Sequence, residues 1–160
     1  MDYNIPHKEL VTLLQSAEKE LLSSKIFKFE RTKLWRQQTI PDYPGVYCLY
    51  EKKGRKYELL YVGESGSLRE RMSDICRTVN HTFRRQIAKK RFNVAIISKR
   101  TQPNTEQMLD NFFDTKLYIS FIRVNFGRTE IEAFLAEKYK DIILNAKTKR
   151  KLKLVLTDSA

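Results

Sequence analysis

The sequence predicts a small α/β domain in which a central, mainly antiparallel, three-stranded sheet is flanked by helices. Segments 45–50 and 57–63 are rich in apolar and aromatic residues and are separated by a Gly-containing turn, which predicts a β-hairpin. Segment 116–126 carries apolar side chains at alternate positions, as a strand with one buried face does. Helical spacing of apolar residues precedes and follows these strands, so helices are expected to cover the sheet.

The first forty residues are expected to form an N-terminal helical extension. Apolar residues recur at three- and four-residue intervals over 8–29, which predicts an amphipathic helix. Segment 23–39 is expected to be a connector or a second short helix. The sequence therefore divides into an extension, 1–40, and a main domain, 41–160.

Capping residues predict where two helices of the main domain begin. Ser67 and Glu70 have the spacing of a capping box. Thr129 and Glu132 repeat this spacing at the start of a helix that is expected to run to about Asn145. Two further helices are expected, over 81–90 and within 101–114.

The charge of the chain indicates a polyanionic partner. Its 31 Lys and Arg residues against 19 Asp and Glu residues give a net charge of +12, and the basic residues recur along the whole chain. Such a charge favours phosphate contacts through the release of counterions. The alternative is a basic surface that serves only solubility.

Composition argues against a membrane protein or a secreted one. No apolar run approaches the ~18 to 20 residues that a membrane span needs. The N-terminal residues lack the basic flank and apolar segment of a secretory signal, so a cytoplasmic location is expected. The two cysteines, Cys48 and Cys76, lack zinc-binding spacing, and no small-molecule cofactor is expected.

Two tripeptides of the predicted hairpin are candidates for chemistry. They are Gly-Val-Tyr at 45–47 and Tyr-Val-Gly at 61–63, and the hairpin turn brings Tyr47 and Tyr61 near one another. Arg71 follows the second tripeptide by eight residues, just past the first turn of the next helix. Taken alone, either tyrosine is better explained as an ordinary aromatic residue of a strand.

A carboxylate in the last predicted helix is a candidate metal ligand. Glu137 lies beside the apolar positions Phe134 and Leu135, and a carboxylate next to an apolar face usually has a cation to neutralise it. A solvated glutamate on the rim of the helix explains Glu137 as well as a metal ligand does.

In this order and spacing the motifs resemble those of the GIY-YIG nuclease family. The family pattern runs Gly-(Ile/Val)-Tyr, a short hairpin, Tyr-(Ile/Val)-Gly, an arginine on the next helix and, later, a helix with a metal-binding glutamate in a context like Glu-Ala-x-x-x-Glu. The last element is matched by Glu132-Ala133 leading into Glu137. The resemblance covers roughly 45–145.

The resemblance implies a metal-dependent endonuclease that hydrolyses DNA phosphodiester bonds with a single metal ion and a tyrosine base. Glu137 would bind Mg²⁺ or Mn²⁺, and Arg71 would bind the non-bridging phosphate oxygens. Tyr47 would be the base for the attacking water, and Tyr61 would position the water or the phosphate. His81 would orient the base or a phosphate; its alternative is a solvent-facing residue at a helix start.

Basic residues of the matching region are expected to contact the DNA backbone. The six candidates are Lys56, Arg69, Arg84, Arg85, Lys89 and Lys90. Lys56 is also a candidate, with Arg71 and the metal, for lowering the pKa of Tyr47. Without a substantial second domain the protein looks like a stand-alone nuclease, and cleavage of both strands would suggest a homodimer. The rival hypothesis is a catalytically inactive nucleic-acid-binding module of the same fold.

Three positions depart from the family pattern. Ile75 stands where the family frequently has a tyrosine or histidine, and Glu64 stands where repair relatives commonly have lysine. The family's late asparagine is not found at its usual distance, since Asn145 is too near Glu137. These departures predict weaker or differently tuned catalysis.

Overall fold

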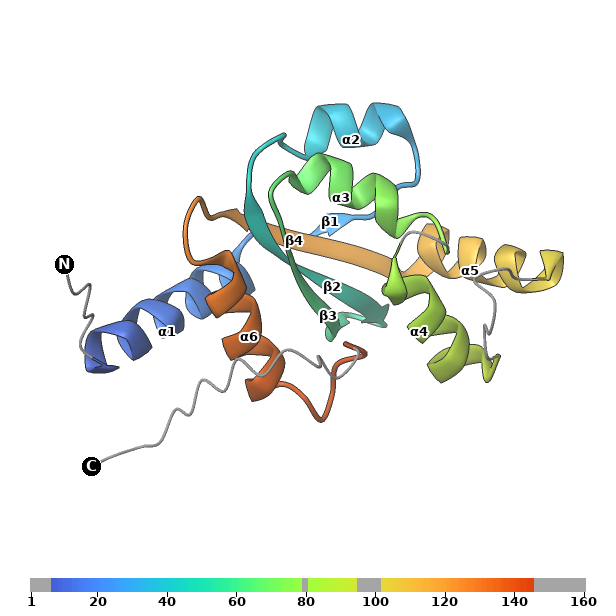
Figure 1. The fold of residues 1–160 in the computed structure, drawn as a ribbon. Coiled ribbons are helices and arrows are strands. Elements are labelled where there is room, and N and C mark those ends of the chain that lie inside the picture. The colour runs from blue at the N-terminus through green and yellow to red at the C-terminus, as the bar shows by residue number, and fades with distance from the viewer. Residues whose placement is uncertain (1–6, 79–80, 95–101, 146–160) are drawn as a thin grey trace.

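A four-stranded antiparallel sheet forms the centre of the protein (Figure 1). The computed structural model describes residues 7–78, 81–94 and 102–145. In space the strands follow the order β1-β4-β2-β3, which leaves β3 at one edge. The strands are β1 (Phe27–Lys28), β2 (Gly45–Lys53), β3 (Lys56–Ser65) and β4 (Leu117–Arg123).

Helices cover both faces of the sheet (Figure 1). They are α1 (His7–Ser23), α2 (Lys33–Thr39), α3 (Leu68–Ile75), α4 (Thr82–Phe92), α5 (Pro103–Lys116) and α6 (Arg128–Lys138). Side chains of α2, α3, α4 and α5 form one hydrophobic cluster with the sheet, and those of α1 and α6 form a second cluster on the opposite face. Within the described residues, no helix is both long enough and apolar enough to cross a membrane.

The β2–β3 hairpin sets the register on which the site depends. Its turn closes at the pair Lys53↔Lys56, where Gly54 adopts a φ of +61° that suits glycine. At the other end Tyr47 pairs with Gly63. A register shift between Leu49 and Tyr50 separates these two ends.

Close packing explains the glycines of both tripeptides. A Cβ on Gly63 would overlap the ring and hydroxyl of Tyr47. A Cβ on Gly45 would overlap the carbonyl oxygen of Ile122 and the side chain of Leu68. The first and last residues of this hairpin motif are therefore glycine because side chains and backbone occupy the space where a methyl group would stand.

The predicted α/β fold is confirmed, with one strand more than expected. β1 is only two residues long, too short to show alternation in the sequence, and it pairs with β4 through Phe27↔Ile119. α1 ends at Ser23 rather than near Phe29; the Ser23 hydroxyl bonds the carbonyl of Lys19 at 2.6 Å at that end.

The expected N-terminal extension contributes to the same core as the rest of the chain. Leu14 and Leu21 of α1 are buried in the cluster that also holds Val46 and Phe134. The division of the chain at residues 40 and 41 stays a prediction, and the basic segment 146–160 lies outside the described residues.

We predict that Gly63→Ala destabilises the protein by about 1 to 3 kcal/mol, the usual cost of overpacking, because the new methyl group displaces the Tyr47 ring. Urea unfolding measures this change. Gly66→Ala is the matched control, since the nearest atom to a Cβ there is the end of the Arg128 side chain at 3.9 Å. Equal unfolding free energies for the two variants would contradict the packing argument.

Candidate active site

The two tyrosines of the hairpin motif lie together near the outer edge of β3. The ring of Tyr47 is buried and lies across Gly63. The ring of Tyr61 stacks beside it, with centroids 6.3 Å apart and an interplanar angle of 26°. The hairpin register thus brings the two tyrosines together as the sequence predicts.

His81 joins this pair from the start of α4. Its ring meets that of Tyr61 edge-on, with centroids 5.4 Å apart. Its Nδ1 accepts a hydrogen bond of 3.0 Å from the backbone N–H of Phe83 and so caps α4. In the neutral ring the proton therefore sits on Nε2. His81 is buried, which rules out the alternative of a solvent-facing residue.

Burial keeps His81 neutral. Loss of solvation lowers the pKa of His81 to about 4, and the nearby charges of Arg71 and Arg85 act in the same direction. At neutral pH the ring therefore carries no charge, and its single N–H donor is on Nε2.

Arg71 supplies the positive charge of the cluster from α3. Its positive charge favours the charged form of Tyr47 and of Tyr61 and disfavours the charged form of His81. Its Nε is buried, and no residue of the described chain accepts a hydrogen bond from it. An unsatisfied buried donor is costly, and an anionic oxygen would satisfy it.

Glu132 supplies the matching negative charge from α6. Its charge raises the pKa of both Tyr47 and Tyr61, although burial is the largest cause of each shift. α6 begins after Gly127 without a side-chain cap, so the capping box predicted for Thr129 and Glu132 is wrong. The Glu132 side chain is half-buried on α6.

Asn145 holds the backbone of the second tripeptide. Its amide nitrogen donates to the carbonyl of Val62 at 2.7 Å, and its oxygen accepts from the Val62 N–H at 3.1 Å. The N–H of Leu144 bonds the carbonyl of Leu60 at 2.7 Å. Residues 144 and 145 thus pair with the outer edge of β3 at Leu60 and Val62, the two residues on either side of Tyr61.

Comparison with known proteins assigns this arrangement to a family. The family model described as the GIY-YIG catalytic domain matches residues 42–156, which is more than half of the chain. The chain belongs to the GIY-YIG family.

A curated GIY-YIG relative matches a shorter stretch. The chain is 39% identical over 54 residues to the UvrABC system protein C of Flavobacterium psychrophilum. The match covers 34% of this chain and 8% of that protein, so the chain spans only a small part of its relative. No solved structure gives a significant match.

The structure does not bring Glu137 to the GIY-YIG tyrosines. Its side chain is 70% exposed and pairs with Lys140 at 3.0 Å. Glu137 follows Glu132 by five residues, which turns it by roughly 140° around a helix with 3.6 residues per turn. The expectation that Glu137 faces the site is therefore corrected, and Glu132 is the carboxylate that sequence reasoning missed. One sequence feature could have indicated Glu132. Asn145 lies too near Glu137 to be the family's late asparagine, whereas Glu132 lies five residues farther from it.

The other two departures from the GIY-YIG pattern have structural explanations. Glu64 accepts a hydrogen bond from Nε of Arg128 at 3.1 Å, so a cation compensates its charge. Ile75, the last residue of α3, is fully buried in the core. Its position is thus used for packing.

Lys56 is too distant to tune Tyr47. It closes the hairpin turn opposite Lys53, seven residues along β3 from Gly63, which corresponds to roughly 23 Å of strand. Burial holds the pKa of Tyr47 well above its ordinary value, and the opposing effect of Arg71 is smaller. Tyr47 is therefore protonated at neutral pH in the protein alone.

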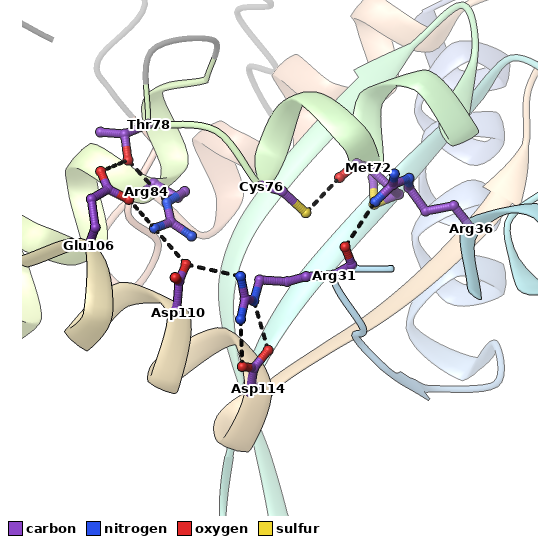
Figure 2. Close-up of polar contacts among 9 residues, drawn as sticks. All are labelled: Arg31, Arg36, Met72, Cys76, Thr78, Arg84, Glu106, Asp110 and Asp114. Atoms are coloured by element: carbon purple, nitrogen blue, oxygen red, sulfur yellow. Dashed lines mark hydrogen bonds and ion pairs between the residues drawn. The ribbon is translucent and has the colours of Figure 1, made fainter. Parts of the chain in front are cut away.

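The expectation that Arg84 contacts DNA is corrected by its burial. Its side chain is 1% exposed and binds Glu106 at 2.6 Å and Asp110 at 3.0 Å (Figure 2). Thr78 accepts a further hydrogen bond from its Nε at 3.1 Å. Figure 2 shows that Arg31 extends this network from Asp110 to another carboxylate of α5. Arg84 therefore joins α4 to α5 inside the fold.

The remaining basic candidates differ in their surroundings. Arg69 bonds the carbonyl of Ile40 at 2.9 Å, and Arg85 bonds the carbonyl of Thr78 at 2.8 Å, so both also hold the backbone in place. The three candidate lysines are all exposed. Lys56 lies at the hairpin turn, and Lys89 and Lys90 lie in the last turn of α4.

We predict that the burial of His81 makes the protein less stable in acid. The unfolded chain binds a proton at its ordinary pKa of about 6.5, whereas the folded protein does so only near 4. His81 should therefore lower the free energy of unfolding by about 2 kcal/mol between pH 7 and pH 4.5. Urea unfolding at the two pH values measures this change. His81→Asn keeps a capping oxygen and should show a smaller loss; an equal loss would contradict the assignment.

Proposed function

We propose that this GIY-YIG nuclease is a divalent-metal-dependent endonuclease that hydrolyses DNA phosphodiester bonds. The observation that carries the proposal is the stacking of the Tyr47 and Tyr61 rings, and the charges of Arg71 and Glu132 act on both of these tyrosines. The unsatisfied buried Nε of Arg71 supports an anionic substrate at this point. The net charge of +12 supports a polyanion as the source of that anion.

The donor set suits a hard divalent cation. Mg²⁺ and Mn²⁺ are held through one or two carboxylates, with waters and substrate phosphates completing the shell. The described residues contain no cluster of three or more His, Cys, Asp or Glu side chains, and a site of this kind needs none. We propose Glu132 as the metal ligand in place of Glu137. When bound, the cation would polarise the scissile phosphate and neutralise charge on the leaving oxygen.

The residues of the chain divide the remaining tasks. Arg71 donates to the non-bridging oxygens, where negative charge grows as the water attacks. The Tyr47 hydroxyl is the acceptor for the proton of the attacking water, which requires it to lose its own proton first. Positive charge from Arg71 and the cation must therefore offset the burial that raises its pKa. Tyr61 and the Nε2–H of His81 orient the water and the phosphate.

A second candidate is a catalytically inactive nucleic-acid-binding module. The burial of Tyr47 and its raised pKa favour it, because a protonated phenol is no base. The two candidates differ in whether DNA is cut when Mg²⁺ or Mn²⁺ is added.

Location and assembly are part of the same proposal. DNA as the substrate is consistent with a cytoplasmic protein. A homodimer would supply the two sites needed to cut both strands, and sedimentation with and without DNA would detect it.

We predict that Glu132→Gln abolishes cleavage and that Glu137→Gln does not. Loss of a group that stabilises charge in the transition state typically costs about a hundredfold or more in rate. The measurement is nicking of supercoiled plasmid with Mg²⁺ or Mn²⁺, and binding of the same plasmid is measured in EDTA. Glu137→Gln is the matched control on the same helix, and its rate should stay within about twofold because a surface pair of this kind contributes little.

The outcomes separate the candidates. Equal rates for Glu132→Gln and the unaltered protein would overturn the assignment of Glu132. Binding without any cleavage by the unaltered protein would support the binding module.

A further inference from the structure

Phe126 is the most exposed large hydrophobic residue in the described part of the chain. Its exposure is 95%, against 63% for Leu34 and 60% for Leu13. It lies in the connection between β4 and α6, so nearly the whole aromatic ring faces solvent. Aromatic rings displayed in this way are suited to stacking on nucleobases.

The connection that carries Phe126 is anchored on both sides. The N–H of Val124 bonds the carbonyl of Pro44 at 3.0 Å. Nη1 of Arg128 bonds the carbonyl of Asn125 at 3.1 Å, and Gly127 turns the chain into α6 with a φ of +87°. The ring is therefore presented by a defined turn, which reduces the entropy lost when a partner binds.

This turn lies at the end of the sheet that carries the candidate active site. Arg123, the last residue of β4, pairs with Gly45 of the first tripeptide. Arg128 bonds Glu64, which directly follows Gly63. Glu132 comes five residues after Gly127, roughly 8 Å along the axis of α6.

Cationic groups flank the aromatic ring. The exposed Arg123 guanidinium lies over the ring of Tyr43 at 5.0 Å, and Arg128 is partly exposed. Of the nearby carboxylates, Glu64 is paired with Arg128, and Glu130 lies in the first turn of α6. Phe126 thus has an arginine three residues before it and another two residues after it in the sequence. An exposed ring with arginines nearby in the chain has the chemistry of a nucleic-acid contact, in which cations bind the backbone and the ring stacks on a base.

We propose that Phe126 stacks on a nucleobase of the DNA substrate within about three nucleotides of the scissile phosphate, as judged from 3.4 Å per nucleotide. The proposal rests on the proposed function of the neighbouring site, because the scissile phosphate defines its place. Duplex DNA would accept the ring as a wedge between base steps, and an unpaired base would offer it a free face.

Fluorescence of Phe126→Trp tests the contact directly. The one native tryptophan, Trp35, is buried and gives a constant background. In EDTA, where no metal supports cleavage, DNA should quench the new tryptophan, while Leu13→Trp on α1 should not respond. The probes are a 20-base-pair duplex and the same duplex with one unpaired base.

Affinity measured by fluorescence anisotropy provides the second readout. Stacking on one base is worth about 1 to 3 kcal/mol by alanine substitution, so Phe126→Ala should raise the Kd about 5- to 150-fold. Phe126→Trp should restore the affinity, and Leu13→Ala should leave the Kd unchanged.

Three results would overturn the proposal. The first is an unchanged Kd for Phe126→Ala, and the second is equal quenching of tryptophans at positions 126 and 13. The third is a slower-sedimenting species for Phe126→Ala than for the unaltered protein, which would show that the ring joins two copies of the chain. Failure of the unaltered protein to bind DNA would instead refute the proposed function. If the protein binds DNA but does not cut it, quenching and Kd still test the stacking, because both are measured in EDTA.

Discussion

The close approach of the Tyr47 ring to the backbone of Gly63 is the constraint on which the site depends. A Cβ at position 63 would overlap the Tyr47 ring, so glycine at this position lets the ring lie against β3. Tyr61 then stacks against it, and His81 and Arg71 approach the pair from α4 and α3. Without this approach the ring of Tyr47 would lie elsewhere in the core, and of the two tyrosines only Tyr61 would remain under the charges of both Arg71 and Glu132.

The edge position of β3 lets helices from both faces contribute to one site. α3 and α4 pack on one face of the sheet and α6 on the other, yet charges from α3 and α6 both act on Tyr47. Asn145 occupies the hydrogen-bonding groups of Val62 that an edge strand would otherwise expose. The same contact fixes the tripeptide that carries Tyr61, so edge protection and orientation of the site are provided by one side chain.

Local patterns predicted most of the fold and half of the site. The hairpin, the third strand and the proximity of Tyr47 to Tyr61 follow from turn chemistry and alternation, which are local properties. The strand β1 gives no such signal in two residues. The choice between Glu132 and Glu137, and the burial of Arg84, depend on how α6 and α4 rotate against their neighbours. Rotation is set by tertiary packing, so apolar periodicity and charge alone show neither which glutamate faces the tyrosines nor which of the six basic candidates is buried.

Titration of the Tyr47 phenol tests the central claim most directly, by NMR of ¹³Cζ-labelled tyrosine with Tyr47→Phe for assignment. We expect the pKa of Tyr47 to lie well above the ordinary value of about 10, because its phenol is buried. The pKa should fall in Glu132→Gln, where a nearby negative charge is lost, and stay unchanged in Glu137→Gln. A pKa at or below 10 in the unaltered protein, or an equal response to both substitutions, would contradict the geometry of the site.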